Sequence, residues 1–211
     1  MAAEFPPLYP ILDASFLPVH ERSAYLTSLV SELADAGVTL LQYRNKRGSD
    51  AEILADAAVV RAAAPDALRL IMNDNPELVV YASFDGVHVG QEDLSPAAAR
   101  AIVGPDRIVG VSTHNPAQIE VAAQQPIEYI AIGPVFATSS KLNPDPVVGL
   151  EGLREARALT DKPLVAIGGI TLENARAVLD AGADSVAVIS AMFGPGKDSA
   201  KIAKDFLRIF R

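Results

Sequence analysis

The chain has 211 residues, half of them hydrophobic, with a formal net charge of −8 at pH 7 and no cysteine. This length favours one domain around a single large core, and the acidic charge argues against nucleic acid or an anionic membrane as a partner. The absence of cysteine excludes disulfides, a thiolate nucleophile and thiolate metal ligands. No apolar run reaches the ~20 residues of a membrane span, and the first residues lack the pattern of a signal peptide. We therefore expect a cytoplasmic protein, and the sequence leaves its oligomeric state open, a homo-oligomer included.

Short apolar runs alternate with longer, alanine-rich stretches of helical period. The runs predict eight strands, at residues 8–12, 39–44, 69–73, 86–89, 108–112, 129–133, 163–167 and 185–189. The stretches predict eight helices, at residues 23–36, 51–63, 77–81, 97–102, 117–123, 150–159, 172–181 and 201–210. Helix starts are predicted at Asn75, Ser95 and Asn115, each followed by proline, and helix ends at Gly37 and Gly182. Strict alternation of eight strands and helices predicts a single-domain (β/α)8 TIM barrel over residues 1–211.

The seventh and eighth predicted strands end in a pattern typical of a phosphate site. Val165–Ile170 finishes in Gly168-Gly169, and the next strand finishes in Ile189-Ser190. Glycine lets the backbone approach an anion closely, and free N–H groups at the start of the next helix can then bind it. These strand ends therefore indicate a phosphorylated small molecule as the ligand.

Cationic residues follow the second predicted strand. Alternation along extended chain places Gln42, Arg44 and Lys46 on one side, toward the end of the barrel where active sites lie. A guanidinium beside an ammonium group suits the several oxygens of a diphosphate. The same triplet also fits an ordinary solvated loop, and by itself does not separate the two interpretations.

Two carboxylates follow the next two strands. Asn73-Asp74 ends the third predicted strand, and Asp93 comes shortly after the fourth. Asp74 and Asp93 can converge on one hard cation with oxygen ligands, leaving positions for water and phosphate oxygens as Mg²⁺ prefers. Each of them singly also fits a turn or cap residue, but their occurrence at neighbouring strand ends favours a magnesium site.

Hydroxyl and imidazole groups occur on the fourth and fifth predicted strands. Ser112 offers a hydroxyl at the strand end, and because no His–carboxylate relay accompanies it in the sequence, we assign it hydrogen bonding and not nucleophilic attack. His88 lies within a strand and is predicted to be a hydrogen-bonded interior histidine, whereas His20 and His114 give no signal.

The proline-rich segment 134–149 is the longest break between predicted elements, and it follows a strand end. We expect an active-site lid there. Its residues Thr138, Ser140 and Lys141 supply hydroxyls and a cation that closure brings onto a ligand, although the same residues also fit a polar surface loop.

Together these motifs resemble the thiamin phosphate synthase family in order and spacing over nearly the whole chain. The resemblance rests on Gln42-x-Arg44-x-Lys46, Asn73-Asp74, residues 86–93, residues 110–114, residues 133–141, Gly168-Gly169-Ile170 and Ile189-Ser190. One departure is visible, because Ser140 stands where the family usually has Thr. Serine keeps the hydroxyl and loses a methyl group, so we expect altered loop packing and retained function.

The resemblance implies a magnesium-dependent transferase with two phosphorylated heterocyclic substrates. It implies that 4-amino-2-methyl-5-hydroxymethylpyrimidine diphosphate ionises first, and that a hydroxyethylthiazole phosphate then captures the cation to give thiamin phosphate and diphosphate. By motif position, the pyrimidine diphosphate would be held by Gln42, Arg44, Lys46, Asn73, Ser112 and Lys141. The thiazole phosphate would be held by Thr138, Ser140, Gly169, Ile189 and Ser190. Arg44, Lys46, Ser112 and Lys141 would carry the catalysis, with Asp74 and Asp93 as metal ligands.

Three alternatives remain at this point. A thiazole tautomerase-like relative shares the barrel but matches the diphosphate and metal positions incompletely. Another phosphate-handling barrel, such as an indole or sugar-phosphate isomerase type, shares the glycine pair but does not need the two aspartates. A non-catalytic binder of thiazole phosphate or thiamin phosphate would keep the ligand site without turnover.

Overall fold

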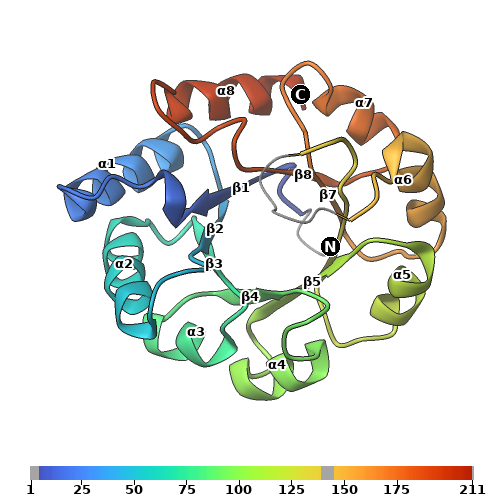
Figure 1. Cartoon of the computed structure of the whole chain (residues 1–211), viewed down its shortest axis with the longest axis horizontal. Helices are drawn as coiled ribbons and strands as arrows, with labels where there is room; N and C mark the ends of the chain where they lie inside the picture. The colour runs from blue at the N-terminus through green and yellow to red at the C-terminus, as the bar shows by residue number, and fades with distance from the viewer. Residues whose placement is uncertain (1–4, 139–144, 211) are drawn as a thin grey trace.

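Eight parallel strands close into a barrel in the computed structural model, which describes residues 5–138 and 145–210. Figure 1 looks down this barrel and shows the helices as an outer ring. The strands are β1 (Leu8–Asp13), β2 (Leu40–Arg44), β3 (Arg69–Asn73), β4 (Gly86–Val89), β5 (Ile108–Thr113), β6 (Tyr129–Ile132), β7 (Leu164–Ile167) and β8 (Ser185–Val188). The helices are α1 (Arg22–Asp35), α2 (Asp50–Ala63), α3 (Pro76–Ala82), α4 (Pro96–Val103), α5 (Pro116–Ala123), α6 (Gly149–Ala158), α7 (Ala175–Asp180) and α8 (Ser199–Ile209). Because the strands are parallel, all eight end at one rim, which we call the mouth, and begin at the other, which we call the floor.

The predicted fold class and all sixteen predicted elements are confirmed. Most bounds agree within one residue, and the largest difference is the start of α7, at Ala175 instead of residue 172. The intervening residues form a turn in which the Asn174 side chain accepts the N–H of Thr171 (2.8 Å) and donates to the carbonyl of Gly169 (3.0 Å). A short 3-10 helix, Ala14–Phe16, follows β1 and was not predicted. None of the helices in residues 5–138 and 145–210 has the length and apolar character needed to cross a membrane.

Two of the three predicted helix caps form. The Ser95 side chain accepts the N–H of Ala98 (3.2 Å), and the Asn115 side chain accepts the N–H of Gln118 (3.0 Å). At Asn75 the helix starts as predicted, but the side chain makes no cap hydrogen bond, and its amide donates to the carbonyl of Asn73 instead (3.3 Å). The cause is Asp74, whose left-handed backbone (φ 65°) turns the chain sharply just before α3.

Alternate residues of the strands fill the barrel interior with one buried cluster. Its members are Tyr9, Ile11, Leu40, Ile71, Tyr129, Ala131, Val165 and Ala187. Gly110 on β5 makes room for the largest of them, because a Cβ at this position would lie 2.0 Å from Cζ of the Tyr129 ring. The interior is therefore solid beneath the mouth, and it contains two phenols in an otherwise apolar layer.

One polar arrangement occurs three times at the floor. A carboxylate just before a strand pairs with an arginine from a helix and also accepts the backbone N–H of a residue at the start of the preceding strand. The three sets are Arg61, Asp85 and Leu70 N; Arg100, Glu128 and Val109 N; and Arg157, Asp184 and Leu164 N. The backbone bonds measure 2.7, 2.6 and 2.7 Å. Each set ties a helix to a pair of adjacent strands and so holds the barrel closed far from the mouth.

Candidate active site

At the β1–β2 corner of the mouth, Arg44 forms a close ion pair with Asp13. Asp13 ends β1, and its carboxylate also accepts the N–H of Ser15 (2.9 Å), which holds it at the start of the short 3-10 helix. Burial opposes the charge on Asp13, but the bonds from Ser15 and Arg44 outweigh it, so the pKa of Asp13 lies below its ordinary value. Arg44 is therefore held in position by an ionised carboxylate that the sequence analysis did not identify.

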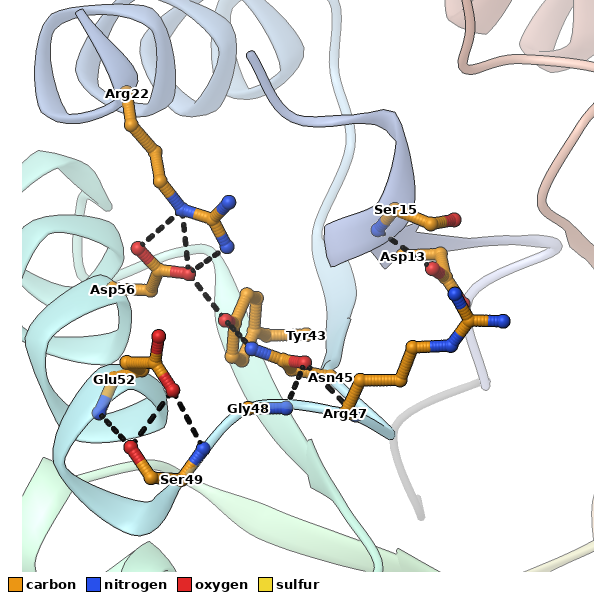
Figure 2. Close-up of polar contacts among 10 residues, drawn as sticks. All are labelled: Asp13, Ser15, Arg22, Tyr43, Asn45, Arg47, Gly48, Ser49, Glu52 and Asp56. Atoms are coloured by element: carbon orange, nitrogen blue, oxygen red, sulfur yellow. Dashed lines mark hydrogen bonds and ion pairs between the residues drawn. The ribbon is translucent and has the colours of Figure 1, made fainter. Parts of the chain in front are cut away.

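A second set of side chains braces the loop after β2 from outside the barrel (Figure 2). Arg22 at the start of α1 donates to both carboxylate oxygens of Asp56 on α2, at 2.8 and 2.5 Å. Tyr43 points outward from β2 and donates its hydroxyl to the same Asp56, and Asn45 donates to the Tyr43 oxygen (3.3 Å). The Asn45 side chain in turn accepts the backbone N–H groups of Arg47 (3.2 Å) and Gly48 (2.8 Å). This brace fixes the loop that carries Lys46.

Lys46 reaches the carboxylate of Asp74, the first residue after β3. It forms a close ion pair with Asp74, whose backbone N–H donates to the carbonyl of His88 on β4 (2.8 Å). Asp93 lies beside Asp74 and accepts the N–H of Gly90 (2.7 Å). Burial raises the pKa of Asp74 above its ordinary value, Lys46 opposes this, and contact with the Asp93 carboxyl adds to the rise. The carboxyl groups of Asp74 and Asp93 thus lie together at the mouth.

A line of hydrogen bonds crosses the barrel beneath this charged region. It runs through Gln42 on β2, Tyr9 on β1, Tyr129 on β6, His88 on β4 and Ser112 on β5, with each of the four links at 2.8 Å. His88 is a hydrogen-bonded interior histidine, as predicted, and burial lowers its pKa to about 4. Its second ring nitrogen contacts a tyrosine and not a carboxylate, so the line is not a nucleophile-activating triad.

The β7–β8 side of the mouth is built from backbone. Gly168 and Gly169 both have positive φ, at 101° and 64°. A Cβ on Gly169 would lie 2.6 Å from the carbonyl oxygen of Ala137, so only glycine fits between the end of β7 and the segment after β6. The carbonyl of Ser190 beyond β8 accepts a hydrogen bond from the side chain of Lys197, a cation that the sequence analysis did not single out.

These regions line one cavity of about 2080 Å³. The predicted site residues that line it are Gln42, Arg44, Lys46, Asn73, Asp74, Asp93, Ser112, Thr138, Gly169, Ile189 and Ser190. Ser140, Lys141 and the centre of the predicted lid 134–149 lie outside the described residues. Within the described part of the chain, no group of three or more His, Asp or Glu side chains is arranged to hold a metal.

Comparison with known proteins identifies the family. The family model described as thiamine monophosphate synthase matches residues 8–192. The chain belongs to this family. A thiamine-phosphate synthase of Koribacter versatilis is 54% identical over 206 residues, covering 98% of this chain and 96% of the relative. One of Agrobacterium fabrum is 42% identical over 189 residues, covering 87% and 84%.

A solved structure agrees with the sequence relatives. The thiamine phosphate pyrophosphorylase from Pyrococcus furiosus superposes with a TM-score of 0.83 at 31% identity, covering 96% of this chain and 94% of that chain. The predicted family is thereby confirmed, and the protein is an enzyme.

Proposed function

We propose that the enzyme joins 4-amino-2-methyl-5-hydroxymethylpyrimidine diphosphate to hydroxyethylthiazole phosphate, giving thiamin phosphate and diphosphate, with Mg²⁺ as cofactor. The observation that carries this proposal is the single cavity that contains both the charged β1–β4 side and the glycine-lined β7–β8 side. Pockets for one small ligand usually measure about 300–1,000 Å³, and this cavity of about 2080 Å³ has room for two substrates. The relatives named thiamine-phosphate synthase support the same reaction.

The charge balance of the β1–β4 side supports a divalent cation. The β1–β4 part of the cavity lining has four cations, Arg22, Arg44, Lys46 and Arg47, and six carboxylates, Asp13, Glu52, Asp56, Asp74, Glu92 and Asp93. Arg44 is already paired with Asp13, and Lys46 with Asp74. A diphosphate would be repelled by this net negative side unless another positive charge were added. Asp74 and Asp93 offer the oxygen ligands that Mg²⁺ prefers, and would hold it while its remaining positions take water and diphosphate oxygens. When bound, the ion would neutralise charge on the departing diphosphate.

The proposed chemistry breaks one bond and forms one bond without a protein base. The carbon–oxygen bond between the pyrimidine methylene and the diphosphate breaks, and both electrons leave with the diphosphate. The lone pair of the thiazole nitrogen then forms the new carbon–nitrogen bond. Arg44 and Lys46 stabilise the leaving diphosphate by charge, and the Ser112 hydroxyl donates to it. Fixed charges and donors of this kind supply a large share of catalysis wherever negative charge develops.

The β7–β8 side would hold the second substrate. Backbone N–H groups near Gly169 and Ser190 would bind the thiazole phosphate, with Thr138 and Ile189 contributing to the same wall. The motif resemblance adds Ser140 to this group and Lys141 to the diphosphate group. A tautomerase-like enzyme or a simple phosphate binder would need only this side, so neither accounts for the paired aspartates and cations opposite.

The decisive experiment supplies both phosphorylated heterocycles with Mg²⁺ and measures diphosphate release. We expect release only when the thiazole phosphate is present, and a tautomerase or a binder would release none. In the same assay Asp93→Asn, which keeps an acceptor for the Gly90 N–H but removes the charge, should lower kcat/KM by about 100-fold. Thiazole phosphate affinity should stay nearly unchanged, because its site lies across the cavity.

The matched control is Asp66→Asn, which removes the same charge from an exposed turn on the floor side and should leave kcat/KM unchanged. If Asp93→Asn lost affinity for both substrates equally, the division of the cavity into two sides would be wrong.

A further inference from the structure

The line of hydrogen bonds beneath the mouth can have only one direction. Gln42 contacts the Tyr9 oxygen through its Nε2 amide nitrogen (2.8 Å), which carries hydrogens and can only donate. Tyr9 therefore accepts from Gln42 and gives its one hydrogen to its other partner, the oxygen of Tyr129 (2.8 Å). Tyr129 must then give its own hydrogen onward to Nδ1 of His88 (2.8 Å). The donor in each hydrogen bond of the line is therefore fixed by the bond before it.

This direction fixes the tautomer of His88. Since Nδ1 accepts from Tyr129, it carries no hydrogen, and the neutral ring holds its hydrogen on Nε2. Nε2 is 2.8 Å from the Ser112 oxygen and donates to it. The hydroxyl hydrogen of Ser112 is then left for the cavity that this side chain lines. At the other end of the line, Oε1 of Gln42 makes no hydrogen bond within the described residues and is an acceptor beside the same cavity.

The packing around the two tyrosines holds this line of hydrogen bonds in place. Tyr9 is 1% exposed and Tyr129 fully buried, and each hydroxyl has two hydrogen-bond partners, one of which is the other tyrosine. Gly110 lacks the side chain that would displace the Tyr129 ring. Burial also raises the pKa of both tyrosines, so both stay protonated and neutral over the working range of pH.

We propose that Tyr9 and Tyr129 are positioning residues that set the direction of hydrogen bonding across the barrel. By this arrangement β2 presents an acceptor, Oε1 of Gln42, and β5 presents a donor, the hydroxyl of Ser112. An amino-substituted pyrimidine carrying a diphosphate matches this pattern, with its amino group toward Gln42 and a diphosphate oxygen toward Ser112. The inference rests on the proposed function for the identity of this ligand, but the direction itself is a property of the ligand-free protein.

The first test reads the His88 tautomer by 15N NMR of the ligand-free protein. The chain has three histidines, and the His88 signals are assigned by their loss in His88→Gln. We expect the hydrogen on Nε2 in the wild type and in Tyr9→Phe, because both keep the Tyr129 donor. In Tyr129→Phe, Nδ1 loses that donor, and a substantial population should move its hydrogen to Nδ1. Tyr81→Phe, which removes an exposed hydroxyl from α3, is the control and should match the wild type.

The second test measures binding of inorganic diphosphate in the presence of Mg²⁺ by calorimetry. Tyr129→Phe should weaken binding about 10-fold, since Ser112 no longer has a fixed donor direction. Tyr9→Phe should change diphosphate affinity less than twofold but raise the KM for the pyrimidine diphosphate about 10-fold, because Gln42 loses its anchor. Thermal unfolding of each variant shows whether it is folded.

Three results would overturn the proposal: hydrogen on Nδ1 in the wild type, an unchanged tautomer in Tyr129→Phe, or a changed tautomer with unchanged diphosphate affinity. The wild-type measurement decides the direction even if a variant does not fold. An absence of synthase turnover in the wild type would instead reject the proposed function, and it would leave the tautomer and diphosphate results as they stand.

Discussion

The two ends of the barrel use the same residue types for different purposes. At the floor, Asp85, Glu128 and Asp184 each pair with an arginine and also accept a backbone N–H from a strand start. At the mouth, Asp74 and Asp93 lie together, and Asp74 forms an ion pair with Lys46. The floor carboxylates satisfy buried backbone groups, whereas the mouth carboxylates are crowded.

Asp74 shows the difference most clearly. Burial raises the pKa of Asp74, which means that its negative charge is unfavourable in the folded protein. The floor sets place each carboxylate where an arginine and a backbone donor both stabilise it. The floor carboxylates therefore tie helices to strands, while the ionised form of Asp74 at the mouth is held at a cost in stability. Substitutions at the two ends should separate activity from stability.

The largest effect is expected from Arg44→Gln at the mouth. Removing this guanidinium takes away a fixed positive charge from the proposed diphosphate site, and kcat/KM should fall about 100- to 1,000-fold. The glutamine amide can still donate to Asp13, so the melting temperature should stay within about 3 °C of the wild type. Steady-state kinetics and thermal unfolding measure the two quantities. A large loss of stability with little loss of rate would assign Arg44 to the fold instead.

A smaller effect, on stability instead of activity, is expected from Asp184→Ala at the floor. The substitution removes the partner of Arg157 and leaves the buried N–H of Leu164 without an acceptor, which should cost about 2 kcal/mol in the free energy of unfolding. For a chain of this size the melting temperature should fall by about 4–8 °C. At 25 °C kcat/KM should remain within about twofold of the wild type. A strong loss of turnover in the folded variant would contradict the separation of the two ends.

The smallest effect, and the most informative in sign, is expected from Asp74→Asn without metal. Because the folded pKa of Asp74 is raised, the wild type binds a proton more tightly when folded, and its ionised form is destabilised at neutral pH. Asp74→Asn should therefore be more stable than the wild type at pH 7. The difference should shrink as pH falls through the raised pKa and vanish below 3.8, the ordinary value of an aspartate. Asparagine also tolerates the left-handed backbone at this position.

Adding Mg²⁺ to the wild type and to Asp74→Asn tests whether Asp74 binds the metal. The wild type should gain stability with increasing Mg²⁺, whereas Asp74→Asn should gain little, since a ligand that binds only the folded state stabilises it by mass action. Denaturant unfolding over a series of pH values, with and without Mg²⁺, gives both comparisons. Equal stabilisation of the two proteins by Mg²⁺ would place the metal elsewhere.

The sequence alone predicts the barrel closely because its strands are buried on both faces and read as apolar runs. β3 and β4 match the predicted bounds at both ends, and β7 begins one residue later than predicted. The errors are local. Asn75 fails as a cap because Asp74 adopts a left-handed conformation, which the residue type permits but does not dictate.

The candidate site was predictable as far as it depends on strand ends. Parallel strands bring Arg44, Asp74 and Ser112 to one rim whatever the details of packing, and the structure places all three on the same cavity. The partners were not predictable. Tyr9 and Tyr129 meet across the barrel from positions 120 residues apart, and nothing near either one in the sequence indicates the other. Asp13 was missed for a related reason, because its partner Arg44 lies on the neighbouring strand.

The contact between Gly110 and the Tyr129 ring links two positions in evolution. The Tyr129 ring occupies the volume that a side chain at residue 110 would need, so neither residue can change alone without a clash or a void. Relatives with a larger residue at 110 should carry a smaller one at 129. They should then have lost the phenol from the line to His88, and they should bind a ligand with a different arrangement of donors and acceptors. An alignment of family members at these two columns would test whether the two positions change together.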